Sequence, residues 1–389
     1  MNLAIVIPAY NRATALERLL ASLSAAEVPS GTPLVISVDR AVDRRHRPGN
    51  DAVIELARRF RWQHGPCELI VQDDHVGLVG NVFFCGDLAE RFGAIILLED
   101  DLLVSRRAIG YAKKALAFYR DEPRLAGISL NALWFNGFTH QPFLPLPDEG
   151  DVFFLQLSTP QGQVYTAAQW TDFTAWLAAG GPQVTDGDDV HELFATFPAD
   201  DWLAVKARYL AARGKYYVYP RESLTTCVGD PGTHFTQATA VFQAPLQQFR
   251  REFRFQAFDS AAAIYDGFYE LLPERIIRLT DRFEGLAFDM DLYASKAAHQ
   301  LSEAYTLTTR RCRDPLATFG KGLRPLEANV IESFPGAGIS LARRADVDMG
   351  HASTREAQRA NDRYFAREPA DAGGRWRLLN RFRRLFGRE

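Results

Sequence analysis

Three consecutive carboxylates, Glu99, Asp100 and Asp101, follow directly on a run of five apolar residues, 94–98. Adjacent carboxylates repel one another, and desolvation at the end of a buried segment increases that cost. A cation at this point would offset both penalties. Magnesium and manganese prefer oxygen ligands and usually take further ligands from a substrate's phosphates. The triple acid therefore predicts a Mn²⁺ or Mg²⁺ site that works with a diphosphate, and the alternative is a strand end that is polar because it meets water.

The elements that must position these acids alternate along the first 130 residues. Short apolar runs predict strands over 3–10, 33–39, 67–74, 94–101 and 125–131. Apolar residues at helical spacing predict helices over 13–23, 51–60, 79–92 and 107–120. Because the strands are almost continuously apolar and separated by helices, we expect an α/β fold with a mostly parallel sheet covered by helices on both faces.

Ligands of such a sheet bind at the carboxyl ends of its strands. The residues there are polar and mostly acidic, which makes this rim the expected binding site. The candidates before the triple acid are Pro8, Ala9, Tyr10 and Arg12 after the first strand, Asp39 after the second, and Asp73, Asp74 and His75 after the third.

A second acidic pair, Asp200 and Asp201, precedes a predicted helix that ends at Gly214. A glycine-containing loop over 221–235 follows, with His234 near its end. Beyond residue 236 the pattern weakens. We expect helices over 244–255 and 260–272, and short strands of a small accessory element over 304–311, 328–334 and 339–344. These signals divide the chain into residues 1–236, an accessory α+β region 237–348 and a terminal segment 349–389.

Composition narrows the classes of function. The net charge is −3, which gives no field that would attract nucleic acid. No apolar run approaches the ~20 residues of a membrane span, and the first residues lack the positive region of a secretory signal. The four cysteines are scattered without a CxxC pair, which argues against a zinc site or a disulfide framework. We expect a cytoplasmic protein.

The opening stretch AIVIPAYNRATALERLLASL resembles the family 2 glycosyltransferases, which have the GT-A fold. The later stretches IILLEDDLLVS, GISLNALWFNG and FPADDW, taken in order, resemble N-acetylglucosaminyltransferase I and its bacterial relatives. The resemblance covers about residues 3–236. It implies an inverting, metal-dependent transfer of a sugar from a nucleotide sugar, UDP-linked, to a glycan or lipid-linked acceptor.

The resemblance also implies roles for single residues on the donor side. Asp101 matches the direct metal ligand of the family, and Glu99 and Asp100 match the neighbours that position the metal and the sugar nucleotide. Asp39 matches the acid that contacts the uracil. His234 matches a loop residue near the diphosphate and its metal. The residues that match the nucleotide-lining end of the first strand are Pro8, Ala9 and Tyr10.

On the acceptor side, Asp200 matches the general base of the inverting relatives, and Asp201 is its neighbour; the sequence does not separate the two. A carboxylate at a helix N-terminus is stabilised as the anion, which suits a base, whereas the plain alternative is helix capping. Two departures affect the sugar subsites. Gln161 or Gln163 stands where relatives have a tryptophan, and Ala199 stands where the base motif begins with tryptophan, so donor sugar and acceptor stay open.

Two other functions remain in view. A sugar nucleotidyltransferase would need a glycine-rich phosphate loop after the first strand, and PAYNRA contains no glycine. A non-catalytic sugar-binding module would not need acids at two separate sites.

The end of the chain, residues 373–389, combines six arginines with an apolar stripe at helical spacing. This pattern is typical of an interfacial helix and predicts contact with an anionic membrane surface at the inner face of the cell membrane. The alternative is that the stripe packs on the protein itself.

Overall fold

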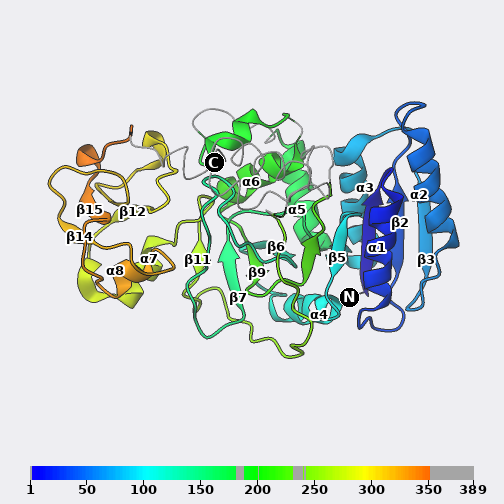
Figure 1. The fold of residues 1–389 in the computed structure, drawn as a ribbon, viewed down its shortest axis with the longest axis horizontal. Coiled ribbons are helices and arrows are strands. Elements are labelled where there is room, and N and C mark those ends of the chain that lie inside the picture. Colours follow the sequence, from blue (N-terminus) through cyan, green and yellow to red (C-terminus); the bar gives the residue numbers. More distant parts are fainter. Residues whose placement is uncertain (1, 181–187, 200, 231–239, 241, 351–389) are drawn as a thin grey trace, which may run out of the picture.

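The computed structural model describes residues 2–180, 188–199, 201–230, 240 and 242–350. A nine-stranded sheet runs through it in the order β11-β7-β9-β6-β8-β4-β1-β2-β3 (Figure 1). Its strands are β1 (Asn2–Ala9), β2 (Leu34–Val38), β3 (Cys67–Val71), β4 (Gly93–Leu97), β6 (Leu125–Ser129), β7 (Val152–Leu155), β8 (Gln163–Thr166), β9 (Tyr216–Pro220) and β11 (Ile264–Tyr265). The pairs β1–β2, β1–β4, β2–β3, β6–β9 and β7–β11 are parallel, and β4–β8, β6–β8 and β7–β9 are antiparallel. The predicted α/β fold with a mostly parallel sheet is confirmed.

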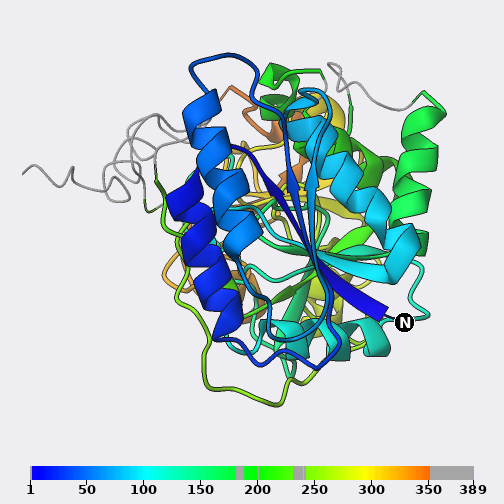
Figure 2. The ribbon, with the colours of Figure 1, turned by 90° about the vertical axis from the view of Figure 1, so that its right-hand side faces the viewer.

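Helices cover both faces of this sheet (Figure 2). On β1, Ile5 and Ile7 lie in the same apolar core as α1, α2 and α4, whereas Val6 lies in the core that contains α3, α5 and α6. Successive strand residues point to opposite faces, so a strand buried on both sides must be apolar at every position. The helices are α1 (Ala13–Ser24), α2 (Arg47–Arg59), α3 (Gly77–Phe92), α4 (Ala108–Phe118), α5 (Ala167–Ala178) and α6 (Trp202–Arg213), with the 3₁₀ turn η1 (Glu192–Thr196) before α6.

A two-stranded antiparallel ladder lies beside the large sheet, formed by β5 (Leu102–Val104) and β10 (Thr225–Cys227). It matters because β5 begins directly after Asp101. Cys227 pairs with Leu102, so the segment that follows β10 starts next to the triple acid.

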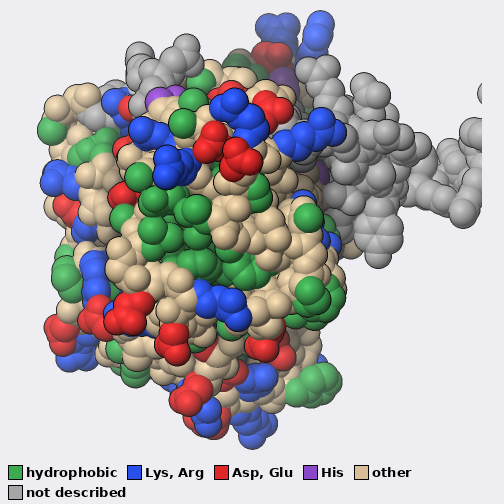
Figure 3. Space-filling model, turned by 90° about the vertical axis from the view of Figure 1, so that its left-hand side faces the viewer, with side chains coloured by type: hydrophobic (Ala, Val, Ile, Leu, Met, Phe, Trp, Pro, Cys, Tyr) green, Lys and Arg blue, Asp and Glu red, His purple; other side chains and the backbone are tan. Residues whose placement is uncertain are grey.

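The C-terminal unit is built on a four-stranded sheet in the order β12-β13-β15-β14. Its elements are α7 (Pro273–Leu279), η2 (Asp281–Phe283), β12 (Phe288–Asp291), η3 (Ala298–Gln300), β13 (Tyr305–Thr308), β14 (Ala317–Phe319), α8 (Ala328–Ile331), β15 (Ile339–Arg343) and η4 (Arg344–Asp346). Apolar side chains gather on the outer face of this end of the molecule, between charged margins (Figure 3). Among the described residues, no helix is long and apolar enough to cross a membrane.

Three predicted elements of the second half are wrong. Residues 244–255 and 260–272 form no helix; they run along the large sheet and add the short strand β11. The rings of Phe253 and Phe255 pack on Tyr111 of α4, with centroids 5.0 and 5.4 Å away, and these contacts favour an extended chain. Residues 328–334, predicted as a strand, instead begin with helix α8, which the buried Asn329 amide anchors by bonds to the backbone of Leu323 and Leu326.

Candidate functional site

The strands β4, β1, β2 and β3 are neighbours and parallel, so their carboxyl ends lie at one edge of the sheet. Two groups of predicted site residues come together there. One group joins the loop after β1 to the turn after β4, and the other joins the loops after β1, β2 and β3. Buried amides on the helices hold the loops in place.

The first group contains Arg12 and the triple acid. Arg12 Nη1 donates to Asp101 Oδ2 at 2.8 Å, and Nη2 pairs with Asp100 Oδ1. The Asp100 side chain is buried, with 5% exposed, whereas 23% of the Asp101 side chain is exposed. No described group donates a hydrogen bond to the Glu99 carboxylate. Arg12 is therefore a cation that the protein itself supplies to two of the three acids.

Arg12 does not fully offset the electrostatic repulsion among Glu99, Asp100 and Asp101, as the raised pKa values of two of these acids show. The pKa of Glu99 is raised to about 8, first by burial and then by the charge of Asp101, whose effect is larger than the opposing effect of Arg12. Burial also raises the pKa of Asp100 to about 6, although Arg12 opposes this shift. Because carboxylates crowded in this way favour any additional positive charge, the turn is suited to a divalent cation or to a cationic part of a ligand.

The residues present fit a hard divalent metal ion that is completed by a substrate. Within the described part of the chain, no three His, Cys, Asp or Glu side chains form a ready-made metal cage. Mg²⁺ and Mn²⁺ sites of nucleotide enzymes commonly use one or two carboxylates and take the remaining ligands from phosphates and water. Asp101, which is partly exposed, and Glu99, which receives no hydrogen bond from the residues that the structure describes, offer oxygen ligands of this kind. His234, the other predicted ligand, lies outside the described residues.

The second group surrounds Asp39, a buried residue with 3% exposure. Its Oδ1 accepts from the amides of Arg40 and Val76 at 2.8 and 2.9 Å, and its Oδ2 accepts from Gly77 N at 3.0 Å. His75 Nδ1 donates to the carbonyl of Arg40 at 2.8 Å, which places the proton on Nδ1, and the same atom lies 2.9 Å from Asp39 Oδ2. Asp39 thereby joins the loops after β2 and β3.

Tyr10 lies between these loops. Its hydroxyl accepts from Val42 N at 3.1 Å, and its ring lies 5.8 Å from the rings of both His46 and His75. The three rings form an aromatic cluster at the rim, and a planar nucleobase can stack on such rings. The two strand residues before Tyr10 are buried: Pro8 and Ala9 pair with Ser37 and Val38 of β2.

Two asparagines that the sequence reasoning missed hold these strand ends together. Asn50 of α2 donates to the carbonyls of Tyr10 and Asp39 at 2.8 and 2.7 Å. Asn81 of α3 donates to the carbonyls of Ala9 and Ser37 at 3.3 and 3.0 Å. Each is 2% exposed. A single amide on an otherwise apolar helix face is the signal that could have revealed them, since buried polar groups require partners.

The two glutamines that depart from the family pattern lie beside the triple acid. Gln163 begins β8, is fully buried and pairs with Leu97 of β4. Gln161 Nε2 lies 3.8 Å from Cys227 Sγ. Burial, with the charges of Asp101 and Glu99, raises the pKa of Cys227 to about 11, which keeps this thiol neutral beside the acids.

The acidic pair before α6 is only partly described, because Asp200 lies outside the described residues. Asp201 is the N-cap of α6: its Oδ1 accepts from Leu203 N and Ala204 N at 3.0 and 3.2 Å. Ala199 is exposed. Asp201 therefore has the capping role that was the plain alternative for this pair.

No protein-family model matches this sequence, and no curated protein matches it. Among solved structures, a mannosyltransferase from Pyrobaculum calidifontis in complex with GDP-Man and Mn²⁺ superposes with a TM-score of 0.38 at 14% identity, over 60% of this chain and 59% of that one. S. aureus TarS 1–349 in complex with UDP-GlcNAc superposes with a TM-score of 0.31 at 16% identity, over 57% of this chain and 60% of that one. The chain thus spans less than two thirds of either neighbour, and similarity at this level assigns it no activity.

Proposed function

We propose that this chain is an inverting glycosyltransferase of the GT-A type, which uses Mn²⁺ or Mg²⁺ and transfers a hexosyl or N-acetylhexosaminyl group from a UDP-linked donor to a glycan or lipid-linked acceptor. The observation that carries the proposal is that two groups of side chains meet at one edge of the sheet: Arg12 with the acids after β4, and Tyr10 with Asp39 and His75. The first suits a diphosphate with its metal, and the second suits a base. Together they suit the nucleobase and the diphosphate of a nucleotide sugar.

On the donor side, the acids after β4 hold the metal through Asp101, with Glu99 and Asp100 beside it. When bound, such a metal acts as a Lewis acid that offsets the charge developing on the leaving diphosphate. Arg12 adds a fixed positive charge at the same place and keeps Asp100 and Asp101 aligned. Tyr10 and His75 orient the nucleobase. The donor sugar then lies on the side of Gln161 and Gln163.

On the acceptor side, Asp200 takes the proton of the acceptor hydroxyl as that oxygen attacks the anomeric carbon. Inversion requires this base to lie across the sugar from the leaving diphosphate. The N-terminus of α6 favours a carboxylate anion, and Asp201 keeps the first turn of α6 in place by capping it. The proposal therefore gives the two acids different duties.

Two alternatives make distinct predictions. A sugar nucleotidyltransferase would exchange pyrophosphate with a nucleoside triphosphate and a sugar phosphate, but the loop after β1 has no glycine for phosphate approach. A sugar-binding module would bind ligand without turnover. A transferase hydrolyses its donor slowly or passes the sugar on, and in either case it releases UDP.

A panel experiment tests the proposal. The protein is incubated with UDP-glucose, UDP-galactose, UDP-GlcNAc and GDP-mannose, with Mn²⁺ or with EDTA, and nucleoside diphosphate release is followed. We expect metal-dependent release from a UDP-linked donor. Pyrophosphate exchange would instead identify a nucleotidyltransferase, and binding without release a sugar-binding module. Release that is equal in EDTA would overturn the metal assignment.

A further inference from the structure

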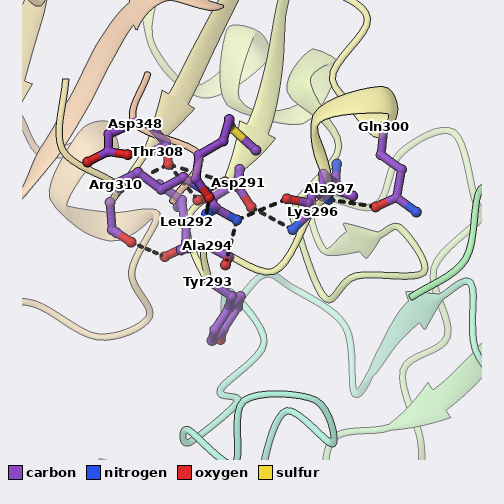
Figure 4. Close-up of polar contacts among 12 residues, drawn as sticks. Asp291, Leu292, Tyr293, Ala294, Lys296, Ala297, Gln300, Thr308, Arg310 and Asp348 are labelled. Carbon is purple, nitrogen blue, oxygen red and sulfur yellow. Dashed lines mark hydrogen bonds and ion pairs between the residues drawn. The ribbon is translucent and has the colours of Figure 1, made fainter. Parts of the chain in front are cut away.

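The C-terminal unit is bonded to the segment that leads into α6. Gln300, at the end of η3, donates from Nε2 to the carbonyls of Asp188 and Val190 at 3.0 and 2.8 Å. Its Oε1 accepts from Ala297 N at 2.8 Å. The amide is therefore fixed at both ends, and one side chain links residues 188–190 to the loop between β12 and η3. Figure 4 shows the bond between Gln300 and Ala297.

The segment that Gln300 holds is itself ordered by local contacts. The His191 ring stacks on Phe138 with centroids 3.9 Å apart and planes 5° apart. Its Nδ1 accepts from Leu193 N at 3.1 Å and caps η1. Phe194 of η1 also meets the Phe138 ring at 5.6 Å. Residues 188–197 thus form a bonded unit that ends three residues before Asp200.

The loop that presents Gln300 is clamped by a buried ion pair. Arg310 Nε donates to Asp291 Oδ2 at 2.6 Å, and both side chains are almost fully buried. Arg310 Nη2 also donates to the carbonyls of Ala294 and Lys296 at 2.7 and 2.9 Å. Asp291 Oδ1 accepts from Lys296 N at 3.0 Å. Figure 4 shows these bonds converging on residues 291–297, directly before η3.

The same loop is attached to the large sheet. Lys296 Nζ lies 2.6 Å from Asp266 Oδ2, and Asp266 follows β11 of that sheet. Tyr293 N donates to Glu270 Oε1 at 2.7 Å. These contacts tie residues 291–297 both to the large sheet and to the buried ion pair, and Ala297 at the end of this loop bonds to the Gln300 amide.

We propose that Gln300 is a positioning residue and that the C-terminal unit fixes residues 188–197, and with them the acceptor side of the active site. The donor site lies at the ends of β1, β2 and β4 and shares none of these contacts. Loss of the Gln300 link therefore lowers transfer to an acceptor while donor binding stays unchanged. This statement about acceptors rests on the proposed function, whereas the positioning of residues 188–197 does not.

Two variants of the full chain separate the link from the local fold. Gln300→Glu keeps an oxygen for Ala297 N but places a second oxygen against two carbonyls, so it breaks the link to residues 188–190. His299→Ala changes an exposed neighbour and serves as control. In hydrogen exchange, we expect the amides of Leu193, Phe194 and Phe197 to exchange about tenfold faster in Gln300→Glu, with α4 and β1 unchanged.

Activity gives the second readout. With p-nitrophenyl glycosides as acceptor probes, Gln300→Glu should lower the acceptor-stimulated part of UDP release at least about fivefold, with the donor KM and the acceptor-independent release as in the native protein. Unchanged exchange over 188–197, or loss of donor binding together with transfer, would overturn the proposal. If no nucleotide sugar is turned over, the proposed function fails, and the exchange measurement alone decides whether Gln300 positions the segment.

Discussion

Arg12 and Asp101 come from different strand ends and meet through one hydrogen bond of 2.8 Å, while the same guanidinium reaches Asp100. Asp101 thus has one oxygen engaged and a quarter of its side chain open to solvent. In the proposed metal site, Asp101 would bind the cation through Oδ1 while Oδ2 keeps its hydrogen bond to Arg12.

Asp101→Asn should abolish Mn²⁺-dependent UDP binding, because an amide is a far weaker ligand for a hard cation than a carboxylate. Calorimetric titration with UDP, with and without Mn²⁺, measures the effect. Asp121→Asn, at an exposed acid outside the predicted site, is the matched control. Retention of full metal-dependent binding by Asp101→Asn would remove Asp101 from the site.

The acidic pair before α6 separates into a base and a cap. Asp200→Asn should lower turnover about 10²- to 10⁴-fold, the usual contribution of a positioned base, with donor affinity unchanged. Asp201→Asn keeps the cap and should leave the melting temperature unchanged, whereas Asp201→Ala should cost about 1 kcal/mol of stability. Turnover near the native rate in Asp200→Asn would contradict this assignment.

The Asp291–Arg310 pair holds the C-terminal unit together. Arg310→Met leaves a buried carboxylate without its cation and should reduce the free energy of unfolding by about 3–5 kcal/mol. Urea denaturation measures this change. Arg313→Met, at a side chain that is 80% exposed and 3.5 Å from Asp346, should change stability by less than about 1 kcal/mol. Equal effects of the two substitutions would show that burial does not strengthen the Arg310 contact.

Lys206 of α6 is fully buried, and its Nζ has no hydrogen-bond partner among the described residues. It lies 3.6 Å from the ring centroid of Phe173, 4.7 Å from that of Tyr165 and 5.2 Å from that of Trp170. Burial lowers the pKa of Lys206 well below its ordinary value, and the charge of Asp172 opposes this only in part. The folded state therefore favours the neutral amine.

Lys206→Met should raise the melting temperature. Below pH ~10.5 the unfolded chain binds a proton at Lys206 that the folded chain resists, so this lysine destabilises the fold increasingly as the pH falls toward its lowered pKa. The gain from the substitution should be large near neutral pH and vanish as the pH approaches ~10.5. Melting curves across this range test it, with the exposed Lys113→Met as control. Lower stability of Lys206→Met at neutral pH would show that the rings hold a charged ammonium.

Residues 373–389 lie outside the described part of the chain, and the membrane contact remains a prediction from their sequence. Full-length protein should float with vesicles that contain anionic lipid, and a chain that ends at Ala372 should not. About 1 kcal/mol for each arginine near such a surface makes the difference measurable, and salt should weaken it. Equal flotation of both chains, or of neither, would contradict a membrane role for this segment.

The first half of the fold is readable from the sequence because its strands are buried on both faces. Runs such as Ala94–Leu98 admit few alternatives once helices flank them. The stretch 251–256 misled because its phenylalanines, Phe253 and Phe255, alternate with charged residues. That alternation has the period of a strand, whereas the apolar residues of the longer stretch 244–255 predict a helix. The alternation identifies an extended chain only once Tyr111 is known to pack against Phe253.

The site was partly readable for a similar reason. Acids at strand ends mark an edge of a parallel sheet, and topology then brings Arg12 to the acids and His75 to Asp39. Contacts such as that of Gln300 with Asp188 and Val190 join segments more than a hundred residues apart. They leave no periodic signal, since a single amide in a turn is ordinary in any sequence.

A carboxylate offers about four lone-pair directions, and at Asp39 the backbone amides of Arg40, Val76 and Gly77 take three of them, while His75 Nδ1 lies 2.9 Å from Oδ2. The remaining direction at Oδ2 lies beside His75, so a pyrimidine imide that bonded to this acid would meet the His75 ring, which is at the surface and has room to move. Selectivity between uracil and guanine would then depend on the cost of moving one imidazole, and replacement of His75 by a smaller residue would open the choice of nucleotide without a change in the acid itself.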